Sequence, residues 1–211
     1  MSKVRFLYAK TGKAKYISHL DLMSMMQRAF LRAGIELKYS EGFNPHPYMS
    51  VALPLQVGSE SICELIDVGI INDTLPDIES IQLPEGIRIH ETYKPVKKFS
   101  EITWVEISVT LHYNMERIES LKDRLVKCFS RDHILITKRT KRGFRELDVA
   151  RYIKDVDFNI DEKLLMTAKM SAQNPTLTLA DLECVFEDKL KPEHLNFRRI
   201  NIYDSNMMKF I

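Results

Sequence analysis

The stretch SHLDLMSMMQRAFLRAG, residues 18–34, predicts the first helix of the fold. Ser18 is a suitable N-cap with Asp21 three positions later, and Gly34 is a residue type that commonly ends helices. Between them, apolar side chains recur at helical spacing, namely Leu22, Met23, Met26, Ala29, Phe30 and Ala33. A short apolar strand is predicted just before, over residues 4–9. The chain therefore starts with a strand and an amphipathic helix.

Outward from this helix, periodicity predicts the remaining elements of a first βαββαβ unit. A turn-rich loop over residues 41–47 is followed by strands over 50–55 and 61–70. A short helix over 75–81 and a strand over 87–93 complete the order.

The same order of elements recurs after a link that contains Lys and Pro, residues 94–100. Residues 103–113 alternate as a strand, and the face toward the core carries Val105, Ile107, Val109 and Leu111. Further helices are predicted over 115–129 and 177–186, and further strands over 134–137, 149–158, 164–170 and 197–203. The sequence thus predicts an α+β protein of two ferredoxin-like (βαββαβ) units packed side by side, residues 1–98 and 99–211.

Composition limits the chemistry that the chain can carry. Its 211 residues hold 31 Lys and Arg against 29 Asp and Glu, a net charge of +2, so only local clusters of charge can attract a polyanion. Cys63, Cys128 and Cys184 are far apart in apolar surroundings, so we expect buried, unpaired thiols in a reducing, cytoplasmic protein. Cys and His are too sparse for an iron–sulfur cluster or a zinc site, so no metal and no cofactor is predicted. No window approaches the ~20 apolar residues of a membrane span, so no membrane contact is expected.

Two segments hold polar groups that neither a strand nor a helix explains, YISHLDL at residues 16–22 and YSEGFNPHP at 39–47. Prolines on both sides of His46 stiffen the second segment and hold Asn44 and His46 at fixed positions. The free amides and the positive dipole end at the helix start favour a bound phosphate. The predicted ligand-binding residues are Ser18, His19, Asp21, Asn44 and His46, and we expect Ser18, His19, Asn44 and His46 to line one pocket. On the alternative interpretation, the first group only caps the helix and the second segment is a rigid connection.

Two basic clusters are the other signal. The first consists of Lys3, Arg5, Lys10, Lys13 and Lys15, with Phe6, Tyr8 and Tyr16 between them, and solvated cations with core aromatics are the favoured interpretation there. The second, centred on Gly143, consists of Lys138, Arg139, Lys141, Arg142 and Arg145 and includes Phe144. Its nearest carboxylates in the sequence are Asp132, Glu146 and Asp148, too few for five cations. We predict that these five residues contact RNA or an acidic partner, with RNA favoured because cations neutralise phosphates and exposed aromatic rings stack on bases. The alternative is a solvated hairpin that binds neither.

Residues 16–23, 39–47 and the stretch ALPLQVG at 52–58 closely resemble the radical SAM-linked family, a bacterial domain of unknown function. The resemblance is specific over residues 4–67, and residues 138–148 are similar to the basic hairpin of that family. Members of the family are encoded beside radical SAM proteins or fused to them. The resemblance therefore implies a radical SAM protein as partner, and it implies no established activity.

Three functions fit these observations. The favoured one is a non-catalytic accessory or substrate-binding subunit that presents RNA, or an RNA-associated protein, to a radical SAM enzyme. Paired ferredoxin-like units also resemble RAMP-type RNA-binding proteins, so the first alternative is a metal-independent endoribonuclease in which His19 or His46 acts as general base. Only Gly86 lies in the loop where that class has a glycine-rich segment, which argues against this alternative. The second alternative is a structural interaction module that binds no nucleic acid.

Overall fold

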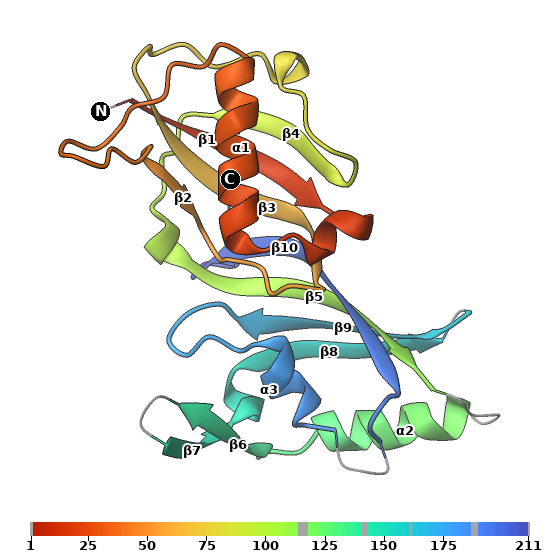
Figure 1. Cartoon of the computed structure of the whole chain (residues 1–211). Coiled ribbons are helices and arrows are strands. Elements are labelled where there is room, and N and C mark those ends of the chain that lie inside the picture. The colour runs from red at the N-terminus through yellow and green to blue at the C-terminus, as the bar shows by residue number, and fades with distance from the viewer. Residues whose placement is uncertain (1, 114–117, 141–142, 161, 187–189, 211) are drawn as a thin grey trace. The chain divides into compact units, whose positions relative to one another are not determined.

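The computed structural model describes residues 2–113, 118–140, 143–160, 162–186 and 190–210 of the chain. It is a mixed α+β structure, mostly sheet with few helices, and it divides into two compact units, Met1–Phe99 and Ser100–Phe210. Figure 1 shows the order of the elements along the chain. Both units are built on antiparallel strands.

The first unit consists of four strands and one long helix. Its elements are β1 (Ser2–Lys10), a 3-10 turn (Gly12–Tyr16), α1 (His19–Arg32), β2 (Met49–Val51), β3 (Glu60–Ile70), a second 3-10 turn (Ile78–Ser80) and β4 (Ile87–Tyr93). The strand order is β4-β1-β3-β2, and each neighbouring pair is antiparallel. The helix α1 crosses the face of β1 and β3 (Figure 1).

The core of the first unit lies between α1 and the strands. Phe6 of β1 and Phe30 of α1 are buried, and their rings stack with 4.7 Å between the centroids. The helix begins where the sequence predicts, because Ser18 Oγ accepts a hydrogen bond of 3.2 Å from the backbone N–H of Asp21. The N-cap therefore fixes the direction in which α1 leaves the end of β1.

The helix predicted over residues 75–81 is not formed. A single 3-10 turn at Ile78–Ser80 stands in its place, started by Asp77, whose Oδ1 accepts from the Glu79 backbone N–H at 3.0 Å. A segment this short gains too few hydrogen bonds to offset the cost of starting an α-helix. Ile81 is buried and Ile78 is half-buried, so the segment reaches the core without helical turns.

The second unit repeats the strand arrangement and adds a hairpin. Its elements are β5 (Ile102–His112), α2 (Ile118–Phe129), β6 (Leu135–Thr140), β7 (Gly143–Asp148), a 3-10 turn (Val149–Arg151), β8 (Ile153–Ile160), β9 (Leu164–Ser171), α3 (Leu179–Glu183) and β10 (His194–Asp204). The order is β10-β5-β9-β8, with antiparallel neighbours. The four residues predicted to face the core from β5 are all buried. The predicted start of α2 at residue 115 lies outside the described residues.

Candidate nucleic-acid interface

The β6–β7 hairpin carries the second basic cluster, and it forms a two-stranded sheet of its own (Figure 1). Its register pairs Lys138 with Arg145 and Arg139 with Phe144, so these pairs lie on opposite faces of the hairpin. The side chain of Phe144 is 78% exposed, and Arg145 is exposed as well. Lys141, Arg142 and the side chain of Arg139 lie outside the described part of the chain. The described hairpin therefore presents an aromatic ring on one face and a cation on the other.

Lys138 anchors this hairpin to the segment that leads into α3. Its Nζ donates to Asp181 Oδ2 at 2.6 Å and to the backbone carbonyl of Thr176 at 3.0 Å. Asp181 is buried and belongs to the capping box of α3 with Thr178. The partner of Lys138 is therefore none of the three carboxylates nearest to the cluster in sequence, because Asp181 lies 43 positions away.

Asp148 fixes the base of the hairpin. Its Oδ1 accepts from the backbone N–H of Ile134 at 2.9 Å, while its Oδ2 lies 2.8 Å from His133 Nδ1 and 3.2 Å from Arg151 Nε. The hydrogen bond with His133, followed by that with Ile134, holds the pKa of the Asp148 carboxyl below its usual range. The hairpin is thus held by two ionic contacts, that of Lys138 with Asp181 and that of Asp148 at its base.

A cavity of about 580 Å³ lies under the hairpin, and we call it the hairpin cavity. Its lining residues are Lys138, Arg145, Leu147, Tyr152, Asn174, Pro175 and Thr176. The loop on its far side is held by Ser171 Oγ, which donates to the carbonyls of Gln173 (3.1 Å) and Pro175 (2.9 Å). Two of the five predicted RNA-contacting residues thus line a cavity that the sequence did not predict.

The first predicted ligand group lies at the start of α1. Ser18 Oγ donates to Asp21 Oδ2 at 2.7 Å and accepts from the Asp21 N–H, so both side chains are engaged in capping. His19 is exposed on the first turn. The geometry agrees with the alternative in which Ser18 and Asp21 only cap the helix.

The second predicted ligand group lies in the loop over residues 41–47. The loop is closed by Ser40, whose N–H donates to the His46 carbonyl at 2.8 Å and whose Oγ accepts from the His46 N–H at 3.0 Å. Gly42 has a φ of 115°, which glycine adopts without strain. Asn44 and His46 are exposed, and the loop joins the sheet through Tyr48, whose carbonyl accepts from Gly69.

The structure does not bring these two groups together, so the expected shared pocket is not formed. The helix start is held at the end of β1, because Lys10 Nζ donates to the Ile17 carbonyl at 2.6 Å. Lys10 itself pairs with Ser61 of β3. The loop is tied to Gly69 at the other end of β3. Ser61 and Gly69 are eight positions apart, roughly 26 Å at about 3.3 Å per residue.

The first basic cluster is partly internal. Arg5 and Lys10 are buried, as are Phe6 and Tyr8. Burial lowers the pKa of the Lys10 ammonium, and the nearby charge of Glu64 opposes that shift. The favoured interpretation was therefore wrong for Arg5 and Lys10, which are buried and not solvated, and for Tyr16, which is exposed; it holds for Phe6 and Tyr8.

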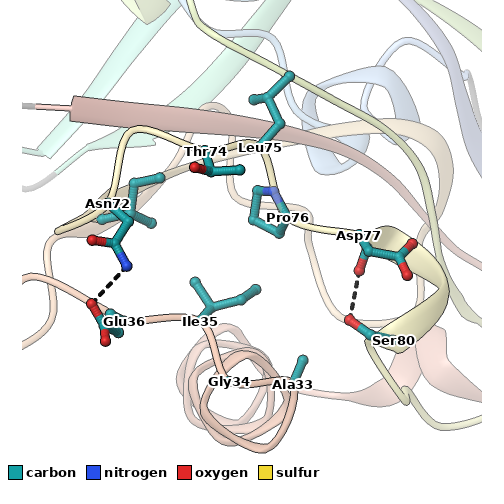
Figure 2. A pocket seen from close by; sticks show the side chains of 11 residues that line it. Ala33, Gly34, Ile35, Glu36, Asn72, Thr74, Leu75, Pro76, Asp77 and Ser80 are labelled. Atoms are coloured by element: carbon teal, nitrogen blue, oxygen red, sulfur yellow. Dashed lines mark hydrogen bonds between the residues drawn. The ribbon is translucent and has the colours of Figure 1, made fainter.

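Two further hollows lie in the first unit. One, of about 230 Å³, sits between the end of α1 and residues 72–80, and Figure 2 shows the Asn72 amide bonded to Glu36 (2.8 Å) and Ser80 bonded to Asp77 (2.7 Å) along its walls. Asn72, Glu36 and Ser80 are thus engaged in hydrogen bonds within the wall. The other, of about 350 Å³, is lined by Lys3, Pro47, Tyr48, Met49, Ser50, Asp67 and Gly69. Both are smaller than the hairpin cavity, and neither holds a cluster of cations.

The cysteines differ in their surroundings. Cys128 is buried with its Sγ 3.7 Å from the Val185 carbonyl, and Cys63 is half-buried, but Cys184 is exposed. The expectation of three buried thiols was therefore wrong for Cys184, which ends the short helix α3. Within the described ranges, no three His, Cys, Asp or Glu side chains are grouped to hold a metal ion. No helix there is long and apolar enough to cross a membrane.

Sequence reasoning missed Asp181, Tyr152 and Asn174 as parts of this site. The spacing of Thr178 and Asp181 predicts a helix cap, and the cap is formed. Nothing in that spacing indicates that Asp181 also pairs with Lys138, because the contact depends on how the hairpin lies over α3.

The fold and the hairpin define an α+β protein of two sheet-rich units with a basic hairpin in the second. Residues 3–179 match a family described as uncharacterized protein conserved in bacteria (DUF2344), and the chain belongs to that family. No curated protein matches the sequence. Among solved structures, a chain of a Cbf5-Nop10-Gar1 complex is similar with a TM-score of 0.49 and 10% identity. That match covers 93% of this chain and 49% of the other, so this chain spans about half the length of its neighbour.

Proposed function

We propose that the chain is a non-catalytic accessory subunit of the cytoplasm that binds single-stranded RNA through the β6–β7 hairpin and presents it to a radical SAM enzyme. The observation that carries the RNA half is the exposed Phe144 ring on a hairpin with basic residues on both strands. Bases stack on exposed aromatic rings whatever their sequence, and neighbouring cations neutralise the phosphates.

The arrangement of strands supports the same reading. The order β4-β1-β3-β2 in the first unit and β10-β5-β9-β8 in the second fits two ferredoxin-like units, in which the second helix of the first unit is reduced to a 3-10 turn. RAMP-type RNA-binding proteins are built from units of this kind. This likeness concerns the fold alone, so the hairpin and not the fold bears the proposal.

The radical SAM partner rests on the resemblance of the motif segments. One structural feature supports a protein partner at these segments: Phe43 is fully exposed at the tip of the stiffened 41–47 loop. Exposed aromatic side chains on rigid elements are typical anchors of protein interfaces. The loop and the hairpin belong to different units, so the two binding functions can be tested apart.

RNA binding is tested with a fluorescent single-stranded oligonucleotide and fluorescence anisotropy over a range of salt. Phe144→Ala is expected to weaken binding about 5- to 150-fold, because a base–aromatic stack contributes about 1–3 kcal/mol. Arg145→Ala should flatten the slope of log affinity against log salt by about 0.7, and a triple Arg139, Lys141 and Arg142 to Ala variant by about 2. Phe43→Ala, a change to another exposed ring in the first unit, serves as the matched control and should bind RNA normally. Normal affinity in all three hairpin variants would show that the hairpin is only solvated.

Partner binding is tested by co-purification with a tagged radical SAM protein from the same organism. Phe43→Ala is expected to weaken capture about 30-fold or more, because anchors of this kind contribute about 2 kcal/mol or more. Phe144→Ala should leave capture unchanged. Sequencing of RNA that co-purifies then identifies the cargo. Failure of the wild-type chain to be captured would remove the radical SAM half and leave the RNA half standing.

One observation favours a second candidate, the endoribonuclease. His133 holds its Nδ1 against Asp148 at 2.8 Å and exposes its ring at the base of the hairpin, which is how a carboxylate orients a general-base histidine. In such a reaction Nε2 would take the proton of a 2′-hydroxyl, whose oxygen attacks the adjacent phosphorus. The bond from phosphorus to the 5′-oxygen breaks, and that oxygen takes a proton from water. The RNA recovered from the binding assay decides between the two. Intact RNA supports the accessory role, whereas fragments ending in a 2′,3′-cyclic phosphate, lost in His133→Ala, would overturn it.

A further inference from the structure

The hairpin cavity has the size and the lining of a pocket for one nucleotide. Its volume of about 580 Å³ falls within the range of roughly 300–1,000 Å³ that small-molecule sites occupy. It is walled by the ring of Tyr152, the ring of Pro175 and the side chain of Leu147. Flat and apolar walls of this kind suit a base that has left its stack.

The cavity walls are held in place by hydrogen bonds of the backbone and of short side chains. The Tyr152 N–H donates to the Val149 carbonyl at 2.9 Å, and its own carbonyl accepts from Ser171 at 2.8 Å. On the other side, Thr176 Oγ1 donates to the Ala172 carbonyl at 3.0 Å. A ligand therefore meets a preformed site and loses little affinity to ordering it.

Some polar groups at the cavity already have a partner within the protein, and others are available to a ligand. Lys138 is neutralised by Asp181 and serves as a fixed wall. Asn174 is exposed at the lining, and its amide makes no hydrogen bond to any described residue. An amide offers one acceptor and two donors, which match the hydrogen-bonding edge of a base.

The positive charge of Arg145 favours a position for the phosphate backbone of the ligand at the rim of the cavity. Arg145 lines the cavity and is exposed, and it forms no ion pair with any side chain that the structure describes. A guanidinium in this position suits a phosphate, which it binds through two parallel hydrogen bonds.

We propose that the hairpin cavity takes one unstacked base of a single-stranded RNA, with Tyr152 against the base, Asn174 on its edge and Arg145 on its phosphate. This proposal rests on the proposed RNA binding and names the kind of ligand that the inner face of the hairpin takes. Phe144 stacks a different base on the outer face.

The test compares wild type, Tyr152→Leu and Asn174→Gly in the full chain by fluorescence anisotropy with single-stranded RNA. Tyr152→Leu keeps an apolar wall and removes the ring, while Asn174→Gly removes the amide and keeps a residue that accepts the positive φ of 54°. Tyr152→Leu is expected to weaken binding about 5- to 150-fold and Asn174→Gly about 2- to 10-fold. Neither should change the salt slope, since neither removes a phosphate contact.

A second measurement locates the base. In a series of oligonucleotides with one abasic position each, one abasic position should weaken wild-type binding and have no further effect in Tyr152→Leu. Normal affinity in both cavity variants, together with weak binding in Phe144→Ala, would overturn the cavity proposal and leave RNA binding intact. Wild-type protein that binds no RNA at low salt would overturn both.

Discussion

Replacing Asp67 with Ala is expected to lower the free energy of unfolding by about 3–5 kcal/mol, because it leaves a buried guanidinium without its counter-ion. Arg5 Nε donates to Asp67 Oδ1 at 2.6 Å and Nη2 donates to Oδ2 at 3.0 Å. The two side chains are only 1% and 10% exposed. Urea denaturation of the full chain, followed by circular dichroism, measures the loss.

The same arginine holds the end of the first unit in place. Its Nη2 also donates to the Lys97 carbonyl at 2.9 Å, and its guanidinium carbon lies 4.3 Å from the centroid of the Phe99 ring. Arg5 therefore attaches the segment after β4 to β1. We expect the backbone amides of residues 97–99 to lose protection from hydrogen exchange in Asp67→Ala before those of β1 do.

Two further variants distinguish the effect of the buried charges on stability from the effect of packing. In Arg5→Met with Asp67→Leu, both charges are replaced by apolar groups, and most of the lost stability should return. Asp73→Ala removes one partner of the exposed pair with Lys94 at 2.7 Å and should change stability little. If Asp67→Ala were no more harmful than Asp73→Ala, the buried pair would contribute nothing to the stability of the fold.

Periodicity predicts most of the fold because burial follows it closely. The strand predicted over residues 87–93 is β4, and the helix predicted from Ser18 is α1. The same reasoning fails over 75–81, where Leu75, Ile78 and Ile81 have helical spacing but only a 3-10 turn forms. Spacing records which side chains face the core, and a short segment can meet that requirement without a helix.

The predicted shared pocket is not formed because the order of elements places its two motifs at opposite ends of the strands. The helix α1 leaves the end of β1 and runs back along the strands, so the connection before it and the connection after it lie at opposite ends (Figure 1). Ser18 and His46 stand in these two connections and cannot meet. The prediction joined two motifs that are alike in composition, although topology separates them.

The hairpin cavity was beyond prediction for a different reason. Its residues come from three places in the sequence, the hairpin strands, Tyr152 and the loop at Asn174. Lys138 links the first to the last through its hydrogen bonds to the Thr176 carbonyl and to Asp181. A cluster of five cations suggests a binding surface, but which of them stays available depends on such distant partners.

Gly86→Ala is expected to lower the free energy of unfolding by about 2–5 kcal/mol, from two separate causes. The φ of Gly86 is 87°, which costs an Ala residue about 1–2 kcal/mol. A Cβ there would also overlap the backbone oxygen of Thr11 and lie 2.9 Å from Ala14 Cβ, and such crowding costs a further 1–3 kcal/mol or so. Thr11 cannot move aside freely, because its N–H donates to the Gly86 carbonyl at 2.7 Å.

Gly58→Ala is the matched control, since its φ is 89° and a Cβ there meets nothing within 4 Å. It should show only the backbone cost of about 1–2 kcal/mol. Urea denaturation of both variants therefore isolates the crowding as the difference between them. Equal losses would show that the contact between β1 and the turn before β4 yields without cost. A larger loss of stability in Gly86→Ala than in Gly58→Ala would show that Gly86 has a structural role. Its presence would then not indicate a glycine-rich catalytic loop.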